Sequence, residues 1–460
     1  MSRRIGGKLR TSRRGFLAAG AGLVAAAGTG LGAGAATKAL AESMEPSALD
    51  AGSRKESEPF WGEHQGGIVT PAQSHTYFAA FDLVTTKRDD LVKLLRAWTS
   101  AAARMAPGQT AQPLEGGLEP VVVAGGAEGQ AKGYDTYETP DWRAVAADSG
   151  EALGLPPARL TVTFGFGAGL FIKDGKDRYG LAAHRPEALV DLPKFVGDQL
   201  VEAHTGGDLS VQACADDPQI AFHAVRQLAR LADNVAQLRW AQTGFIPGYG
   251  GKETPRNLMG FRDGTNNPAV ADPKAMEKSV WVGGEGPVWM SGGSYVVVRR
   301  IRIALEHWDR MKVAFQEQTV GRSKYSGAPL GKKSEFDPLD LDATDKDGNP
   351  LIAENAHVRL AAAASNDGAQ ILRRPYSYND GVNFTAERWP PWRQGMEYDA
   401  GLLFVAYQRD PRTGFIKIYD RMSKFDMMNQ FVTHVGGGLF ACPGGPAEGE
   451  FIGQRLFESA

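Results

Sequence analysis

The most constraining feature of this 460-residue chain is an order of strands and amphipathic helices that occurs twice. In the first half, an apolar, β-branched run predicts a strand at 76–84, and apolar residues at helical spacing predict a helix at 88–105. The same patterns predict three more strands, at 159–167, 208–214 and 236–243, and one more helix, at 217–233.

The second half repeats this plan with one long interruption. A strand is predicted at 294–303 and a helix at 305–318. An irregular stretch over 320–398 follows, and then a strand at 401–407 and a helix at 420–433. Long irregular segments in compact domains are usually functional, so this stretch is where a site is expected.

The repeated order predicts the fold class. Two strand–helix–strand units with antiparallel returns indicate an α+β fold of two ferredoxin-like modules, each a split βαβ unit with an antiparallel sheet. We place the modules at 61–245 and 246–460.

The N-terminus has the features of an export signal. Arg13 and Arg14 precede a mildly apolar stretch at 17–36, and small residues at 39–41 form a cleavage site. We expect a twin-arginine signal peptide at 1–41, a flexible leader at 42–60, and a mature protein in the periplasm or in the extracellular or cell-wall space. A membrane anchor is the alternative. The stretch is rich in Gly and poor in bulky aliphatic residues, so we expect no transmembrane segment in the mature chain.

The composition excludes several functional classes. With a net charge of −2 the chain shows no basic face, which argues against nucleic acid as a partner. The chain contains neither CxxCH nor HExxH, so covalent haem attachment and a zincin site are unsupported. Cys214 and Cys442 are the only cysteines, and we expect both to be unpaired thiols.

A glycine-bracketed carboxylate stands out in the segment 260–268. Gly260 and Gly264 flank Asp263, and an Asn-Pro pair closes the segment. Glycines allow the backbone to approach a ligand closely, so Asp263 is a carboxylate on a shaped loop. A plain turn is the alternative.

Two other segments carry side chains suited to a cofactor. His357 precedes the alanine-rich run 361–364, whose small side chains leave room for a large planar group. Arg373 and Arg374 follow an apolar pair, which favours a guanidinium aimed into a pocket beside an anion. Surface arginines stacked on nearby tyrosines are the alternative.

Together these segments resemble the dye-decolorizing peroxidase family, and most closely its exported deferrochelatase/peroxidase subgroup. The motifs are Gly260-x-x-Asp263-Gly264, His357-Val358-Arg359-Leu360 and Ile371-Leu372-Arg373-Arg374-x-Tyr376-Ser377-Tyr378. Further similarity covers 60–71, 425–431 and 438–443, so the resemblance extends over nearly all of 60–460.

The resemblance implies one haem b per chain, in a pocket of the C-terminal half. It implies that His357 binds the iron and that Asp263 and Arg373 act on the opposite face, with a one-residue error to Arg374 left open. The other cofactor contacts that it implies are Gly264, Thr265, Asn266, Ala362, Ala363 and Ala364. Ala362 to Ala364 replace the Asn-Pro-Arg of some relatives, so a charged contact to the haem edge is lost here.

The implied function is a peroxidase that reduces hydrogen peroxide and oxidises dyes or phenolic or porphyrin-type donors through a ferryl intermediate. Electrons could enter through aromatic relays, for which the candidates are Tyr376, Tyr378, Trp389 and Trp392. One alternative is a deferrochelatase that releases iron from haem, with iron-uptake proteins as partners. Another is an exported substrate-binding protein without redox chemistry. Relatives are often dimers, which leaves a homodimer open.

Overall fold

The computed structural model describes residues 56–113, 147–247, 254–386 and 394–459. The predicted signal peptide and most of the predicted leader lie outside these ranges. Within them, no helix combines the length and the apolar character needed to cross a membrane.

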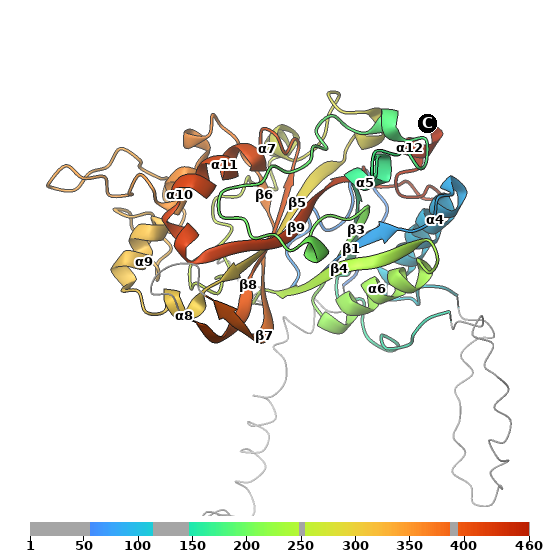
Figure 1. Cartoon of the computed structure of the whole chain (residues 1–460), viewed down its shortest axis with the longest axis horizontal. Coiled ribbons are helices and arrows are strands. Elements are labelled where there is room, and N and C mark those ends of the chain that lie inside the picture. Colours follow the sequence, from blue (N-terminus) through green and yellow to red (C-terminus); the bar gives the residue numbers. More distant parts are fainter. Residues whose placement is uncertain (1–55, 114–146, 248–253, 387–393, 460) are drawn as a thin grey trace, which may run out of the picture. The chain divides into compact units, whose positions relative to one another are not determined.

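The strands in this part of the chain form one antiparallel sheet (Figure 1). They are β1 (His75–Leu83), β2 (Thr161–Gly167), β3 (Leu209–Ala215), β4 (Ala236–Phe245), β5 (Ser294–Ile303), β6 (Leu372–Arg373), β7 (Tyr376–Ala386), β8 (Gln394–Gln408) and β9 (Val432–Cys442). The helices are α4 (Arg88–Met105), α5 (Ala168–Phe171), α6 (Pro218–Leu231), α7 (Pro273–Ser279), α8 (Leu305–Trp308), α9 (Val313–Val320), α10 (His357–Ala361), α11 (Phe415–Phe425) and α12 (Gln454–Glu458).

The sheet closes into a barrel-like ring. The strand order is β5-β9-β2-β3-β1-β4-β7-β8, and β5 also pairs with β8, while β6 adds to β8. The two seams between the halves are narrow: β4 meets β7 only at Phe245 and Ser377, and β2 meets β9 only at its last two residues. The mixed α+β class and the antiparallel pairing are as predicted, but the strands share one ring instead of forming two separate sheets. The seams join residues far apart in sequence, which local patterns do not reveal.

Strand alternation gives the ring two apolar cores. In β1, Ala79 and Phe81 pack in a core with α4 and α6, whereas Phe78 and Ala80 point into the ring interior. The other strands alternate in the same way because successive side chains of a strand point to opposite faces. Cys214 belongs to the interior core, and it and Cys442 are free thiols, as predicted.

The two helices of the first half cover its outer face. Asp217 caps α6 by accepting a hydrogen bond from the Gln219 backbone N–H at 2.8 Å, and Pro218 occupies its first turn. α4 buries one apolar face that includes Leu91 and Trp98. These helices pack together against β1 and β3 (Figure 1).

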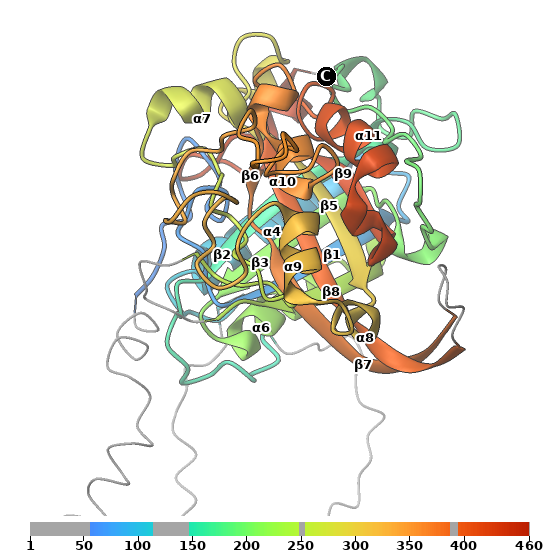
Figure 2. The same ribbon diagram turned by 90° about the vertical axis from the view of Figure 1, so that its left-hand side faces the viewer.

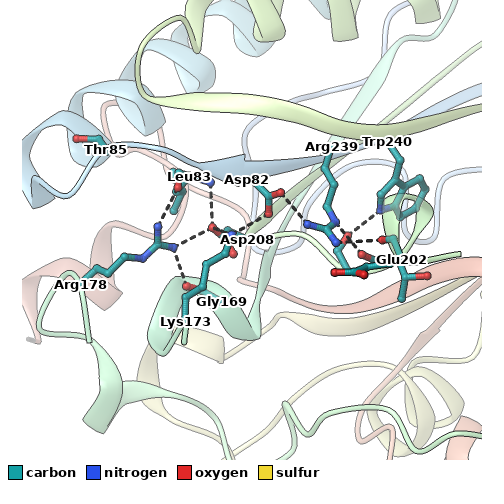
Figure 3. A network of polar contacts seen from close by, with 12 residues as sticks. Asp82, Leu83, Thr85, Gly169, Lys173, Arg178, Glu202, Asp208, Arg239 and Trp240 are labelled. Atoms are coloured by element: carbon teal, nitrogen blue, oxygen red, sulfur yellow. Dashed lines mark hydrogen bonds and ion pairs between the residues drawn. The ribbon is translucent and has the colours of Figure 1, made fainter. Parts of the chain in front are cut away.

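A buried carboxylate ties the same half together (Figure 3). Asp208 Oδ2 accepts from Lys173 Nζ at 2.9 Å, from Arg178 Nη2 at 2.8 Å and from the Leu83 backbone N–H at 2.9 Å. Asp82 extends the network by pairing with Lys173 and with Arg239.

Two predicted helices of the second half differ from the structure. The predicted helix at 305–318 is divided into α8 and α9. The helix predicted at 420–433 is wrong in its second half, because α11 ends at Phe425 and β9 begins at Val432. The three glycines at 436–438 suggest a loop, yet they lie within β9 and let it approach β5. A Cβ on Gly437 would lie 1.9 Å from the Val298 carbonyl oxygen.

Candidate active site

The principal cavity lies on the outer face of the second half of the ring. Its walls come from β5, β8 and β9, from α10 and α11, and from the 257–266 segment. Figure 2 shows α10 and α11 in front of these strands. Much of the wall is apolar, as in Ile301, Ile303, Leu402, Phe404, Ile418 and Met422.

His357 enters this cavity from the first position of α10. Its side chain is 31% exposed. Because His357 lines the cavity, this exposed part faces the cavity interior. Its Nδ1 donates a hydrogen bond to Asp426 Oδ2 at 2.7 Å, which leaves Nε2 as the ring nitrogen available to a ligand. Asp426 is only 3% exposed, and its other oxygen caps the following turn by accepting from the Met428 backbone N–H.

Asp426 also sets the protonation behaviour of His357. Burial lowers the pKa of the imidazole, but the charge and hydrogen bond of Asp426 outweigh burial, and the pKa is raised above its ordinary value. Arg373 and Asp263 also act electrostatically on His357, with opposite signs. The imidazole and this pair therefore share one electrostatic environment.

Asp263 and Arg373 form an ion pair at the cavity wall. Arg373 Nη1 donates to Asp263 Oδ1 at 2.6 Å. The Arg373 side chain is 27% exposed, and that of Asp263 is 11% exposed. The second oxygen, Oδ2, accepts only a long contact of 3.4 Å from Asn257. A carboxylate oxygen and part of a guanidinium thus remain open to the cavity.

Backbone contacts hold both members of the pair. Asn267 donates to the Arg373 carbonyl at 2.7 Å and accepts from the Arg373 N–H at 3.2 Å. The Asp263 N–H donates to the Pro255 carbonyl at 2.9 Å. Asn267 belongs to the Asn-Pro pair that closes the 260–268 segment, and only the fold shows it facing Arg373.

The two consecutive arginines point to opposite faces of the sheet. Leu372 and Arg374 face the ring interior, and Arg373 between them faces the cavity. Arg374 is buried and donates to the Thr70 carbonyl and to Gln73 Oε1. Arg373 is therefore the arginine beside Asp263, and neither arginine is stacked on a surface tyrosine.

The glycine-bracketed loop is only partly a cavity wall. Gly264, Thr265 and Asn266 line the cavity, but Gly260 does not. Gly260 has φ +86°, and a Cβ there would lie 2.8 Å from Cε of Lys324. The expectation that both glycines bring the backbone close to a ligand therefore needs correction: Gly260 serves the turn and its packing.

The alanine-rich run also needs correction. Ala361 and Ala363 line the cavity, but Ala362 and Ala364 do not. α10 ends at Ala361 and a short 3-10 turn follows, so Ala362 packs into the protein and Ala364 is exposed to solvent.

The aromatic relay candidates occupy different environments. Tyr376 and Tyr378 are fully buried. Tyr376 contacts Cys214 Sγ at 3.5 Å, and Arg300 lies over the Tyr378 ring. Trp389 and Trp392 lie outside the described residues.

Two charged residues of the site carried no assigned role in the sequence. Asp426 lies in a stretch that contributed to the family resemblance, but nothing in its neighbours links it to His357. Arg322 lines the cavity and lies near enough for its charge to interact with Arg373. It donates to the carbonyls of Gly327 and Glu335, and burial lowers its pKa.

Comparison with known proteins agrees with this geometry. Residues 65–246 match the model of the Dyp-type peroxidase N-terminal region, and residues 254–447 match that of the C-terminal region. The chain is 37% identical to the dye-decolorizing peroxidase of Thermobifida fusca, over 97% of each chain, and 36% identical to the deferrochelatase of Escherichia coli K12, over 89% and 90%. The solved structure of ferric DtpA from Streptomyces lividans matches with a TM-score of 0.75 and 38% identity, covering 90% of this chain and 100% of that one. The chain belongs to the Dyp-type peroxidase family.

Proposed function

We infer that this protein is a haem-dependent peroxidase that reduces hydrogen peroxide and oxidises organic donors. The observation that carries this conclusion is one apolar cavity that holds both an imidazole with a free Nε2 and an aspartate–arginine pair. The peroxidase and deferrochelatase relatives support the same class of chemistry.

The cavity residues fit a haem. His357 would bind the iron through Nε2, and no group in the described chain forms a hydrogen bond with that atom. Asp426 would keep the ring oriented and increase its basicity, as outer partners of metal-bound histidines do. Arg322 adds positive charge that suits the acidic side chains of a haem. We propose one haem b per chain, held without covalent bonds, with Gly264, Thr265, Asn266 and Ala363 as contacts.

Bound haem supplies a redox centre for the two-electron cleavage of peroxide. The protein supplies proton transfer and charge stabilisation. Asp263 Oδ2 lacks a short hydrogen bond, so the carboxylate can take the proton from one peroxide oxygen and return it to the other. Arg373 holds Asp263 in place and stabilises negative charge on the departing oxygen.

A spectrum tests this proposal directly. Protein purified with haem should show a Soret band, and one equivalent of hydrogen peroxide should change it within the mixing time. An organic donor should then restore the starting spectrum. If the protein takes up haem but peroxide leaves its spectrum unchanged, the peroxidase assignment is wrong.

Iron release from haem is the second candidate function. The similarity to deferrochelatases over most of the chain favours testing it, and the same cavity would hold the haem substrate. Incubation of the haem-loaded protein under reducing conditions should yield intact metal-free porphyrin if this function exists. Iron-uptake proteins would be the partners.

We also propose that the ring consists of two ferredoxin-like modules. In the first half the strands lie in the order β4-β1-β3-β2, and in the second half in the equivalent order β9-β5-β8-β7. Both are the order of a split βαβ unit, with helices after the first and third strands of each half. We propose module boundaries at 61–245 and 246–460, which this division supports.

Export by the twin-arginine route remains part of the proposal. The paired arginines and the cleavage site support it, and they predict a mature N-terminus at Glu42 in the periplasm or extracellular or cell-wall space. N-terminal sequencing of the mature protein, with and without Arg13→Lys plus Arg14→Lys, tests the prediction.

A further inference from the structure

The hairpin of β7 and β8 carries an exposed apolar patch. Val382 lies opposite Tyr398, and Phe384 lies opposite Met396, so all four side chains are on one face of the hairpin. The side chains are 58% exposed in Val382, 64% in Phe384, 63% in Met396 and 50% in Tyr398. We call these four residues the hairpin patch.

The patch lies on a two-stranded extension of the ring. β4 pairs with β7 only at Phe245 and Ser377, and β5 pairs with β8 only as far as Gly401. Beyond these pairs, β7 and β8 pair with no other strand in the described part of the chain, and Figure 2 shows them extending past their neighbours. A two-stranded hairpin is marginally stable in water unless another element packs against it. The exposed patch is the face that such an element would cover.

Ion pairs hold the opposite face of the hairpin. Glu397 is buried, and its Oε2 lies 3.7 Å from Arg302 Nη1. Two residues further along β8, Asp399 accepts from Arg300 Nη2 at 2.9 Å. Successive residues of a strand point to opposite faces, so these contacts orient the hairpin with the patch on its outer face.

We propose that the hairpin patch packs against the hairpin patch of a second copy of this chain, related by a two-fold axis. The Tyr398 hydroxyl is the only strong hydrogen-bonding group of the patch, so the patch suits an apolar surface and offers a charged partner nothing to pair with. A two-fold axis brings the same surface of both copies together, and apolar sheet faces pack on each other. The net charge of −2 opposes this association only weakly.

The area of the patch fits a weak dimer. Its four side chains expose roughly 400 Å² per copy, the size at which an apolar patch marks an interaction site. Two copies would bury about 800 Å² at the centre of the interface, and exposed hairpin residues such as Asn379 would add a polar rim. Stable interfaces bury about 1,200–2,000 Å², so this one lies at the lower end, and we expect a Kd of about 1–10 μM.

Sedimentation velocity of the haem-loaded protein between about 0.1 and 100 μM tests the proposal, and it needs no peroxide reaction. Val382→Lys and Phe384→Lys should each weaken the dimer by about tenfold or more, because they place charges of one sign in an apolar contact. Val288→Lys replaces a valine that is 78% exposed outside the hairpin and should leave the Kd within about twofold. An unaltered Soret band and circular dichroism spectrum would show that the variants are folded.

A mixing experiment shows whether the two patches meet. Phe384→Lys and Phe384→Glu alone should both associate weakly, because like charges face each other across the axis. An equal mixture should associate about tenfold more tightly than either variant, because the charges are then opposite. A wild type that stays monomeric up to about 100 μM would leave the patch to a different partner and overturn the proposal. A dimer that is no weaker in the lysine variants than in Val288→Lys, or a mixture that gains no affinity, would overturn it as well.

Discussion

Asp208 in the first half and Asp263 in the second both pair with arginine, but their surroundings differ. Asp208 is 3% exposed, and one of its oxygens accepts from Lys173, Arg178 and a backbone N–H (Figure 3). Asp263 accepts one short hydrogen bond from Arg373 and lies at the wall of a cavity.

The comparison shows which surroundings would suit an ion pair to the proposed proton transfer. Protein donors surround Asp208, so its carboxylate fixes the chain. Asp263 keeps an oxygen with only a long contact, next to a cation and within the cavity of His357. A free acceptor beside space for a substrate is what proton transfer requires. Replacements at four places in the molecule test this contrast, from the largest expected effect on the peroxide reaction to the smallest.

Replacement of His357 has the largest expected effect. His357→Ala removes the only proposed iron ligand, so haem content after reconstitution should fall to near background and the peroxide reaction should be lost. The pyridine haemochrome assay measures this content. His307→Ala, in α8 outside the cavity, is the matched control and should retain haem. Normal haem content in His357→Ala would show that His357 is not the iron ligand.

Replacement of either member of the pair should slow the reaction without removing haem. Asp263→Asn removes the base and Arg373→Leu removes the cation, and each should lower the second-order rate constant with peroxide by about 10²–10⁴-fold. Stopped-flow spectroscopy of the Soret band measures it. Rates for both variants within a few-fold of wild type would show that the pair does not act on peroxide.

Much of this site follows from local sequence, but its supporting contacts do not. Glycines around Asp263 indicate a shaped loop, but 320–398 is predicted to be irregular, so β6 and the opposite directions of Arg373 and Arg374 are not predicted. The contacts that hold the site join distant residues: Asp426 lies 69 residues after His357, and Asn267 lies 106 residues before Arg373.

Local sequence also predicts part of the fold, but not the contacts that join its two halves. The helix at 88–105 and the strand at 294–303 are predicted to the residue, because their apolar patterns are strong. The ring is not predicted, because its seams consist of one or two residue pairs at strand ends. β9 is missed because its glycines serve contact with β5, while the same residues in isolation indicate a loop.

A smaller effect is expected at Asp426, and it depends on pH. Asp426→Asn should weaken haem affinity about 10–100-fold at neutral pH because the imidazole loses its anionic partner. In the haem-free wild type the raised pKa of His357 means that protonation stabilises the fold. This contribution is complete below the unfolded pKa and is lost as pH rises through the folded pKa.

Iron binding requires the neutral imidazole, so haem affinity of the wild type should fall as pH decreases through that raised pKa. In Asp426→Asn the fall should begin at lower pH. Haem titrations between pH 5 and 8 measure both curves. Identical curves for the two proteins would show that Asp426 does not control the protonation of His357.

The smallest effect on the peroxide reaction is expected at Asp208, although its effect on stability is large. Asp208→Asn leaves Lys173 and Arg178 without their shared buried anion, which should lower the free energy of unfolding by about 3–5 kcal/mol. Asp82→Asn breaks a pair that is 29% exposed, and it should lower stability by only about 0–1 kcal/mol. Urea unfolding of the haem-loaded proteins measures this difference, and stopped-flow rates with peroxide should stay within twofold of wild type in both variants. If Asp208→Asn slowed the peroxide reaction as strongly as Asp263→Asn while leaving stability unchanged, an open acceptor beside a cavity would no longer distinguish the two aspartates.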